Sequence, residues 1–188
     1  MRSMNTPSEI AVLSLVCNRL EQANVPYMLT GSFASNFYTV PRMTRDIDIV
    51  IELQRTNKEK LIQVLKDEFY ISSDAINEAI NLQSMFNVIH NDSVFKIDFI
   101  IRKNASYRET EFQRRKQINL DNQLIWIVSP EDLIISKLFW AKDSSSQIQL
   151  RDIQNLLRSV KDLDQTYLNT WIQKLQLEST FKKVGSHG

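Results

Sequence analysis

The chain has 188 residues, of which 43% are hydrophobic and 24% are charged, proportions typical of an ordinary globular protein. Its 23 Lys and Arg residues nearly balance its 22 Asp and Glu residues, which excludes a broadly basic, nucleic-acid-coating surface but allows local basic patches. Cys17 is the single cysteine, which excludes an internal disulfide and a cysteine-based metal site.

Neither end of the sequence predicts a targeting or anchoring segment. The first ten residues, MRSMNTPSEI, lack a long apolar region, and no stretch approaches the roughly 18 apolar residues of a membrane span. We therefore expect a cytoplasmic protein with no membrane partner. Residues 181–188, which end in VGSHG, are expected to form a flexible tail.

Helices and strands are interspersed in the first two thirds of the chain. The spacing of apolar residues predicts helices over residues 8–22, 32–38, 57–69, 73–80 and 107–115. Runs of β-branched and apolar residues predict strands over residues 25–30, 46–53, 85–90, 94–101 and 123–128. Ser73 is the predicted cap of its helix, Cys17 is expected to be buried, and Asn91-Asp92 is the predicted turn of a hairpin.

The pattern changes near residue 129, after which only helices are predicted, over residues 130–142, 147–160 and 165–175. The first of these has a strong start signal, with Ser129 as N-cap, Pro130 at the first position and two acids in the first turn. We therefore expect an α+β fold with a small mixed sheet flanked by helices. It comprises a mixed core over residues 1–128 and a helical part over residues 129–180, packed on the core.

Two carboxylates interrupt the most apolar predicted strand, DIDIVIEL, at Asp46 and Asp48. Residues i and i+2 of a strand point to the same face, about 6.6 Å apart, so these side chains project together. Two adjacent carboxylates repel each other, and burying them without a nearby positive charge costs roughly several kcal/mol of stability. Arg42 and Arg45 could supply that charge, but a Mg²⁺ ion suits carboxylate oxygens better.

Gly31 and Asp98 fit the same picture. Gly31-Ser32 lies between a predicted strand and a short helix, where backbone can approach a ligand closely and a helix N-terminus attracts phosphate. Asp98 is a lone carboxylate in another apolar strand, VFKIDFII, and would join Asp46 and Asp48 if the two strands are neighbours. The stretch therefore predicts a phosphate site beside a metal site.

These motifs resemble the polymerase-beta-like nucleotidyltransferase superfamily, whose signature is a G-[GS] helix start, a D-x-D strand and a third acid on a neighbouring strand. The segment from Arg42 to Asp48, R-x-T-x-D-I-D, is most similar to the AbiEii-type branch, which includes nucleotidyltransferase toxins of toxin–antitoxin systems. Lys137 and the pair Arg151-Asp152 match a later lysine and R-D motif. The resemblance covers roughly residues 8 to 160, and the one departure is Ser32, where many relatives carry a second glycine.

The resemblance implies a nucleotidyltransferase fold and a transferase that moves NMP from a nucleoside triphosphate, such as ATP, to a hydroxyl acceptor. It implies that Asp46, Asp48 and Asp98 hold Mg²⁺ or Mn²⁺, with Asp98 also helping to deprotonate the acceptor. It further implies phosphate contacts from Gly31, Ser32, Arg42, Arg45 and Lys137, and a place near the site for the catalytic acid Asp152. The implied acceptor is an RNA or tRNA end or a protein, and the implied partner is a cognate antitoxin.

Several alternatives compete with these interpretations. The chain could be a degenerate nucleotide- or protein-binding module, or could modify a small molecule such as an antibiotic. Lys137 could extend its ammonium to solvent, and Arg151-Asp152 could cap a helix. Core packing is the favoured role of Trp126, Phe139 and Trp140 over base stacking. His90 is expected at the surface or in a turn. The basic residues Arg102, Lys103 and Arg114–Lys116 form either an RNA-facing patch or a solvated surface.

Overall fold

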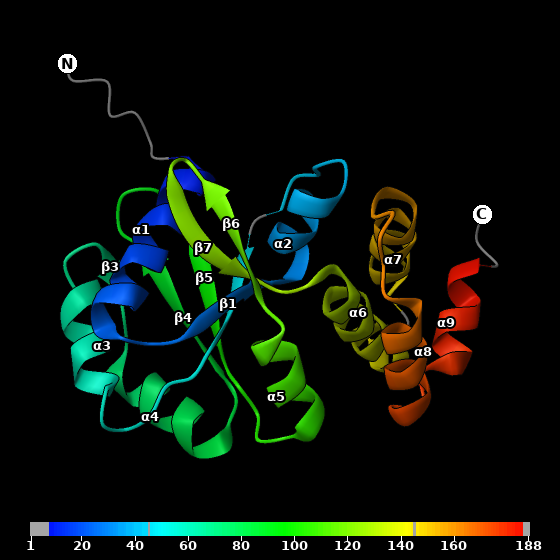
Figure 1. The fold of residues 1–188 in the computed structure, drawn as a ribbon. Coiled ribbons are helices and arrows are strands. Elements are labelled where there is room, and N and C mark those ends of the chain that lie inside the picture. Colours follow the sequence, from blue (N-terminus) through cyan, green and yellow to red (C-terminus); the bar gives the residue numbers. More distant parts are fainter. Residues whose placement is uncertain (1–7, 45, 145, 186–188) are drawn as a thin grey trace.

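A computed structural model describes residues 8–44, 46–144 and 146–185 (Figure 1). The described strands form one seven-stranded mixed sheet in the order β3-β4-β5-β2-β1-β7-β6. β2 lies near its centre, parallel to β5 and antiparallel to β1, while β1 runs parallel to β7. The strand bounds are β1 (Tyr27–Thr30), β2 (Asp46–Ile51), β3 (Phe69–Tyr70), β4 (Met85–His90), β5 (Lys96–Ile101), β6 (Lys116–Leu120) and β7 (Gln123–Ile127).

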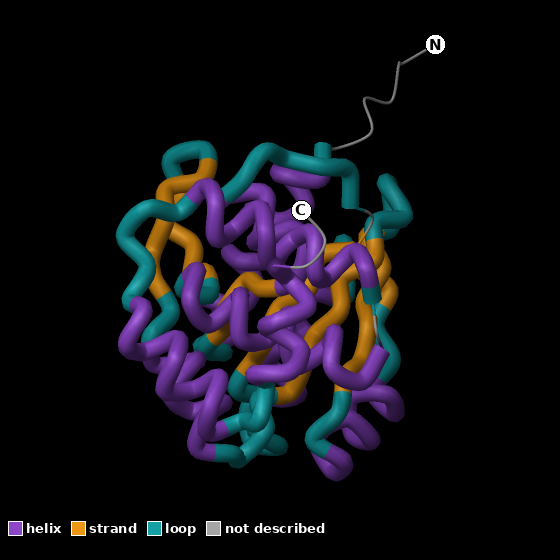
Figure 2. The backbone as a smooth tube through the Cα atoms, turned by 90° about the vertical axis from the view of Figure 1, so that its right-hand side faces the viewer, coloured by secondary structure: helices purple, strands orange, loops and turns teal. Residues whose placement is uncertain are grey.

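Helices cover the sheet and build the C-terminal part. Those within the mixed part are α1 (Glu9–Ala23), α2 (Gly31–Tyr38), α3 (Lys58–Leu65), α4 (Ser73–Leu82) and α5 (Ser106–Gln113). The C-terminal part contains α6 (Pro130–Ser144), α7 (Gln147–Ser159), α8 (Gln165–Lys174) and α9 (Glu178–Gly185). α1 packs against α3, whereas α2 contacts both α6 and α7 and so links the two parts (Figure 1). Figure 2, turned to face the C-terminal part, shows helices in front of the strands.

The core explains why β2 can hold carboxylates. Ile47, Ile49 and Ile51 alternate with the acids and are at most 2% exposed. Burying each isoleucine contributes about 1.5–3 kcal/mol to stability. The register of β2, and the face of the sheet to which each of its side chains points, are therefore strongly determined. Asp46 and Asp48 must therefore point to the opposite face, where Asp48 meets α2 at Gly31.

The helix α6 joins the two parts and is buried over most of its surface. Leu133, Ile134 and Leu138 are at most 1% exposed. Its start is capped as expected, because the Ser129 hydroxyl accepts a hydrogen bond from the Asp132 amide at 3.1 Å and donates to the Asp132 carboxylate at 2.6 Å. This cap fixes the residue at which α6 begins.

The α+β prediction is confirmed, but the sheet is larger than expected. β3 and β6 were not predicted: Phe69, expected in a helix, pairs with His90, and β6 is mostly polar because it lies at a sheet edge beside β7. The cap of α4 is Ser72, whose hydroxyl accepts from the Ala75 amide, and the prediction of Ser73 was wrong.

Two further expectations are corrected at buried positions. The flexible tail is wrong for residues 181–185, which belong to α9 and are held by buried Val184, while residues 186–188 lie outside the described part. His90 is 4% exposed, packs edge-on to Phe69 and contacts the Ser93 hydroxyl through Nδ1 at 2.9 Å, so the surface interpretation was wrong. Cys17 is buried, as expected. Among the helices described, none combines the length and apolarity that crossing a membrane requires.

Candidate functional site

The three predicted carboxylates lie on two neighbouring strands. β2 and β5 are parallel and in register, which places Asp48 opposite Asp98 and Asp46 opposite Lys96. Asp46 is exposed, Asp48 is half-buried and Asp98 is only 5% exposed. The expected meeting of the two strands is therefore confirmed.

Lys96 neutralises part of this cluster, and the sequence interpretation missed it. Its ammonium lies 2.8 Å from Asp98 Oδ2 and 3.6 Å from Asp46 Oδ1. The hydrogen bond to Asp98 raises the pKa of Lys96, so the lysine stays charged. The signal was available, because Lys96 is two residues before Asp98 and so shares its face of the strand.

The electrostatics of Asp48 show that one lysine does not balance three acids. Burial, followed by repulsion from Asp98 and Asp46, raises the pKa of Asp48 from 3.8 to about 6, against the opposing effects of Lys137 and Lys96. The Oδ1 atom of Asp98 is buried without a hydrogen-bond partner. An unsatisfied carboxylate oxygen next to a destabilised carboxylate leaves room for another positive charge.

Gly31 touches Asp48 directly. It opens α2 with φ +69°, and a Cβ atom built on it would lie 2.0 Å from Asp48 Oδ2. A side chain at position 31 would therefore collide with the carboxylate, and the left-handed backbone would also be strained. The glycine expected from the sequence is required by this close approach of backbone to Asp48.

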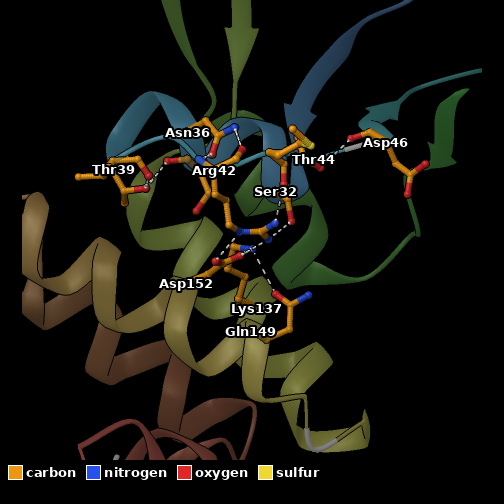
Figure 3. A network of polar contacts seen from close by, with 12 residues as sticks. Ser32, Asn36, Thr39, Arg42, Thr44, Asp46, Lys137, Gln149 and Asp152 are labelled. Carbon is orange, nitrogen blue, oxygen red and sulfur yellow. Dashed lines mark hydrogen bonds and ion pairs between the residues drawn. The ribbon is translucent and has the colours of Figure 1, made fainter. Parts of the chain in front are cut away.

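A second polar cluster joins the mixed part to the helical part (Figure 3). Arg42 donates to both carboxylate oxygens of Asp152, at 3.1 and 3.0 Å, and to the Ser32 hydroxyl at 2.7 Å. The Lys137 ammonium lies 2.7 Å from Asp152 Oδ2 and 3.1 Å from the side-chain oxygen of Gln149. Asp152 thus holds two cations beside the start of α2.

In the buried pair Lys137–Asp152, the hydrogen bonds between the two groups oppose the effect of burial on each pKa. Burial lowers the pKa of Lys137, and the hydrogen bond to Asp152 compensates only in part. Burial also disfavours the Asp152 carboxylate, but the hydrogen bonds from Arg42 and Lys137 outweigh it and hold its pKa below the usual range. Lys137 is 3% exposed, so the interpretation in which its ammonium reaches solvent was wrong. Asp152 lies beyond the first turn of α7, so it does not cap that helix.

A cavity of about 220 Å³ lies where these groups meet. Its lining combines Thr30, Gly31, Ser32 and Asp48 from the mixed part with Lys137 and Gln149 from the helical part. Ile100, Leu133, Ser136 and Trp140 complete the wall. The cavity therefore places a strand–helix turn, a carboxylate and an ammonium around one space.

The residues around Asp48 suit the binding of a divalent cation, because one Asp98 oxygen has no partner and Asp48 is repelled by its neighbouring carboxylates. Within residues 8–44, 46–144 and 146–185, no three His, Cys, Asp or Glu side chains are grouped closely enough to form a ready metal site. Asp46 is the outlying member, at the exposed start of β2 and apart from the Arg42 cluster (Figure 3). Asp48 and Asp98 would hold the cation, with Asp46 further out.

Three further predictions concern Arg45, the basic patch and the aromatic residues. Arg45, expected to contact phosphate, lies outside the described residues. The expected basic patch is largely committed within the fold: Arg102 pairs with Glu52 at 2.6 Å, Arg114 with Asp132 at 3.1 Å, and Arg115 lies over the Trp126 ring. The core-packing interpretation is wrong for Trp140, which is 63% exposed.

The comparisons with known proteins concern the fold. No family model and no curated protein matches the sequence. Among solved structures, the antibiotic-resistance factor ANT(2'')-Ia matches with TM-score 0.61 at 11% identity, over 95% of this chain and 97% of that one. The lincosamide antibiotic adenylyltransferase LnuA matches with TM-score 0.55 at 19% identity, over 83% of this chain and 100% of that one.

An antigenic nucleotidyltransferase-like protein from Paracoccidioides brasiliensis matches with TM-score 0.57 at 19% identity, over 92% of this chain and 91% of that one. Each likeness spans most of both chains. At these identities the likeness concerns the fold and not the reaction. The chain has the nucleotidyltransferase fold, as its motifs predicted.

Proposed function

We propose that this chain is a metal-dependent nucleotidyltransferase, which transfers NMP from a nucleoside triphosphate to a hydroxyl acceptor. The observation that carries the proposal is the contact of Gly31 with Asp48 at a cavity that Lys137 also lines. Backbone at a helix start, a carboxylate and an ammonium are the groups that a metal-bound triphosphate requires. The nucleotidyltransferase fold of the solved relatives supports the same reaction class.

In this proposal the three carboxylates bind the metal, and Asp98 also acts on the acceptor. Asp48 and Asp98, with Asp46, would hold Mg²⁺ or Mn²⁺. When bound, the metal would neutralise charge that develops on the phosphates. The acceptor oxygen forms a bond to the α-phosphorus, the bond from that phosphorus to the bridging oxygen breaks, and pyrophosphate leaves. From the motif resemblance we assign Asp98 a further role, as the carboxylate that takes up the proton of the acceptor hydroxyl.

The polar cluster around Asp152 would bind the triphosphate. The amide end of α2 at Gly31, the Ser32 hydroxyl and the Lys137 ammonium face the cavity and suit phosphate oxygens. Asp152 contacts Lys137 and Arg42 and would orient both cations, which makes it a positioning residue. A phosphate contact from Arg45 is proposed from the motif resemblance alone.

The acceptor is proposed in two forms. The AbiEii-type motifs favour an RNA or tRNA end or a protein hydroxyl, and with them a toxin paired with a cognate antitoxin. A small-molecule acceptor is the second candidate, because Arg102, Arg114 and Arg115, the residues expected to face RNA, are engaged within the fold. Two solved relatives, an antibiotic-resistance factor and a lincosamide adenylyltransferase, support that candidate.

The test is an incorporation assay with four α-labelled nucleoside triphosphates and Mg²⁺ or Mn²⁺. Each is incubated with total RNA, with a panel of aminoglycosides and lincosamides, or with the protein alone, beside the Asp46→Asn/Asp48→Asn double variant. We expect label on one acceptor class and none with the variant. Nucleotide binding without transfer to any acceptor would favour the degenerate binding module, and transfer that persists in the variant would refute the assigned site.

A further inference from the structure

Trp140 is an aromatic side chain that the fold does not use. It lies on α6 and is 63% exposed, although burying a tryptophan is normally among the most favourable contributions to a core. The other tryptophans are engaged: Trp126 lies beneath the Arg115 guanidinium, and the Trp171 ring is 5.0 Å from Tyr107. Packing therefore does not explain why a tryptophan stands at position 140.

The position of Trp140 relative to Lys137 suggests a ligand. The two residues are three apart on one helix, so they are neighbours on the same side of α6, about 4.5 Å apart along its axis. Both line the cavity that Gly31 and Asp48 also line. A ligand whose phosphates contact Lys137 would thus meet the indole ring one helical turn further along.

The cavity wall offers two kinds of chemistry. Gly31, Ser32, Asp48 and Lys137 supply charge, a hydroxyl and free backbone, whereas Ile100, Leu133 and Trp140 supply apolar surface to the same cavity. A nucleoside triphosphate has the same division, with a charged chain at one end and a flat, weakly polar ring at the other.

We propose that Trp140 is the stacking platform for the nucleobase of the bound nucleoside triphosphate. This inference rests on the proposed nucleotidyltransferase function and names the base-binding part of its site. Stacking on an aromatic face is tolerant of base identity, because every base has a π-face. The enzyme therefore discriminates weakly among the bases and binds purine nucleotides more tightly than pyrimidine nucleotides, since purines present the larger ring.

The test compares two probes that differ in the base. ATP and tripolyphosphate, each with Mg²⁺, are titrated by calorimetry into the wild type, Trp140→Ala and Trp140→Phe. Removing one base–aromatic stack costs about 5-fold in affinity at the lower end of the known range. We expect Trp140→Ala to weaken ATP binding at least 5-fold and to leave tripolyphosphate binding unchanged, while Trp140→Phe retains most of the ATP affinity.

The control is Leu82→Ala, which removes another exposed apolar side chain, at the end of α4, and should alter neither affinity. Equal ATP affinity in the wild type and Trp140→Ala would overturn the inference and leave the proposed function standing. Equal loss of ATP and tripolyphosphate would also overturn it, because Trp140 would then support the phosphate site. A wild type that binds neither probe would refute the proposed function and the inference together.

Discussion

Replacing Gly31 by alanine tests the close approach on which the site depends. Alanine at φ +69° costs about 1–2 kcal/mol relative to an ordinary backbone. The new Cβ would also lie 2.0 Å from Asp48 Oδ2 and 2.9 Å from Asp48 Cβ, so rotating the carboxylate away does not remove the clash. Overpacking of this kind costs about 1–3 kcal/mol. We therefore expect Gly31→Ala to lower the free energy of unfolding by about 2–5 kcal/mol.

The measurement is urea denaturation at neutral pH, with the free energy of unfolding obtained by linear extrapolation. Gly185→Ala is the matched control, because a Cβ at that position meets nothing within 4 Å, and we expect a change within about 0.5 kcal/mol. A Gly31→Ala protein as stable as the Gly185→Ala protein would refute the contact between α2 and Asp48, and with it the geometry of the phosphate site.

The remaining predictions concern charge. Because the pKa of Asp48 rises from 3.8 to about 6 on folding, the wild type loses stability as the pH rises through this window. In metal-free buffer, the free energy of unfolding of Asp48→Asn should thus exceed that of the wild type by up to about 3 kcal/mol at pH 7 and by almost nothing at pH 4. A difference in urea midpoints that does not change with pH would contradict this. Asp152→Ala should lower the free energy of unfolding by about 3–5 kcal/mol, because the buried Lys137 ammonium then has no carboxylate partner. Adding Lys137→Met should restore most of that stability. Additive costs in the double-mutant cycle would show that the pair is not coupled. Lys96→Met should bind Mn²⁺ at least about 5-fold more tightly in paramagnetic resonance titrations, because no ammonium then competes for the carboxylates. Lys60→Met, which removes an exposed lysine of α3, is the control, and equal Mn²⁺ affinities in the two variants would exclude that competition.

Local patterns predicted the carboxylate strand well. The alternation of isoleucine with Asp46 and Asp48 determines which face each residue takes, and the structure follows it. The same rule could have found Lys96, which alternates with Asp98 on β5. Gly31 could also be predicted, because a glycine between a strand and a helix in a glycine-poor chain has few other uses.

The contacts between distant segments could not be predicted in this way. Arg42 and Asp152 are 110 residues apart, and their pairing depends on how α7 docks against α2, which no local pattern encodes. The exposure of Trp140 is also a tertiary property, since the residue follows Leu138 and Phe139 in the sequence and such an apolar run favours core packing. The strand β6 is short and has only two apolar residues, Ile118 and Leu120, on one face, so its pattern is weak without the partner edge that β7 offers.

A crystal structure with Mn²⁺ and a non-hydrolysable ATP analogue would test the proposed site most directly. The anomalous signal of Mn²⁺ locates the metal independently of the nucleotide. We predict an Mn²⁺ peak between Asp48 and Asp98, with the triphosphate against Gly31-Ser32 and Lys137. A metal or triphosphate bound elsewhere, with the carboxylates of Asp48 and Asp98 still unoccupied, would contradict the assignment of this cavity as the active site of a nucleotidyltransferase.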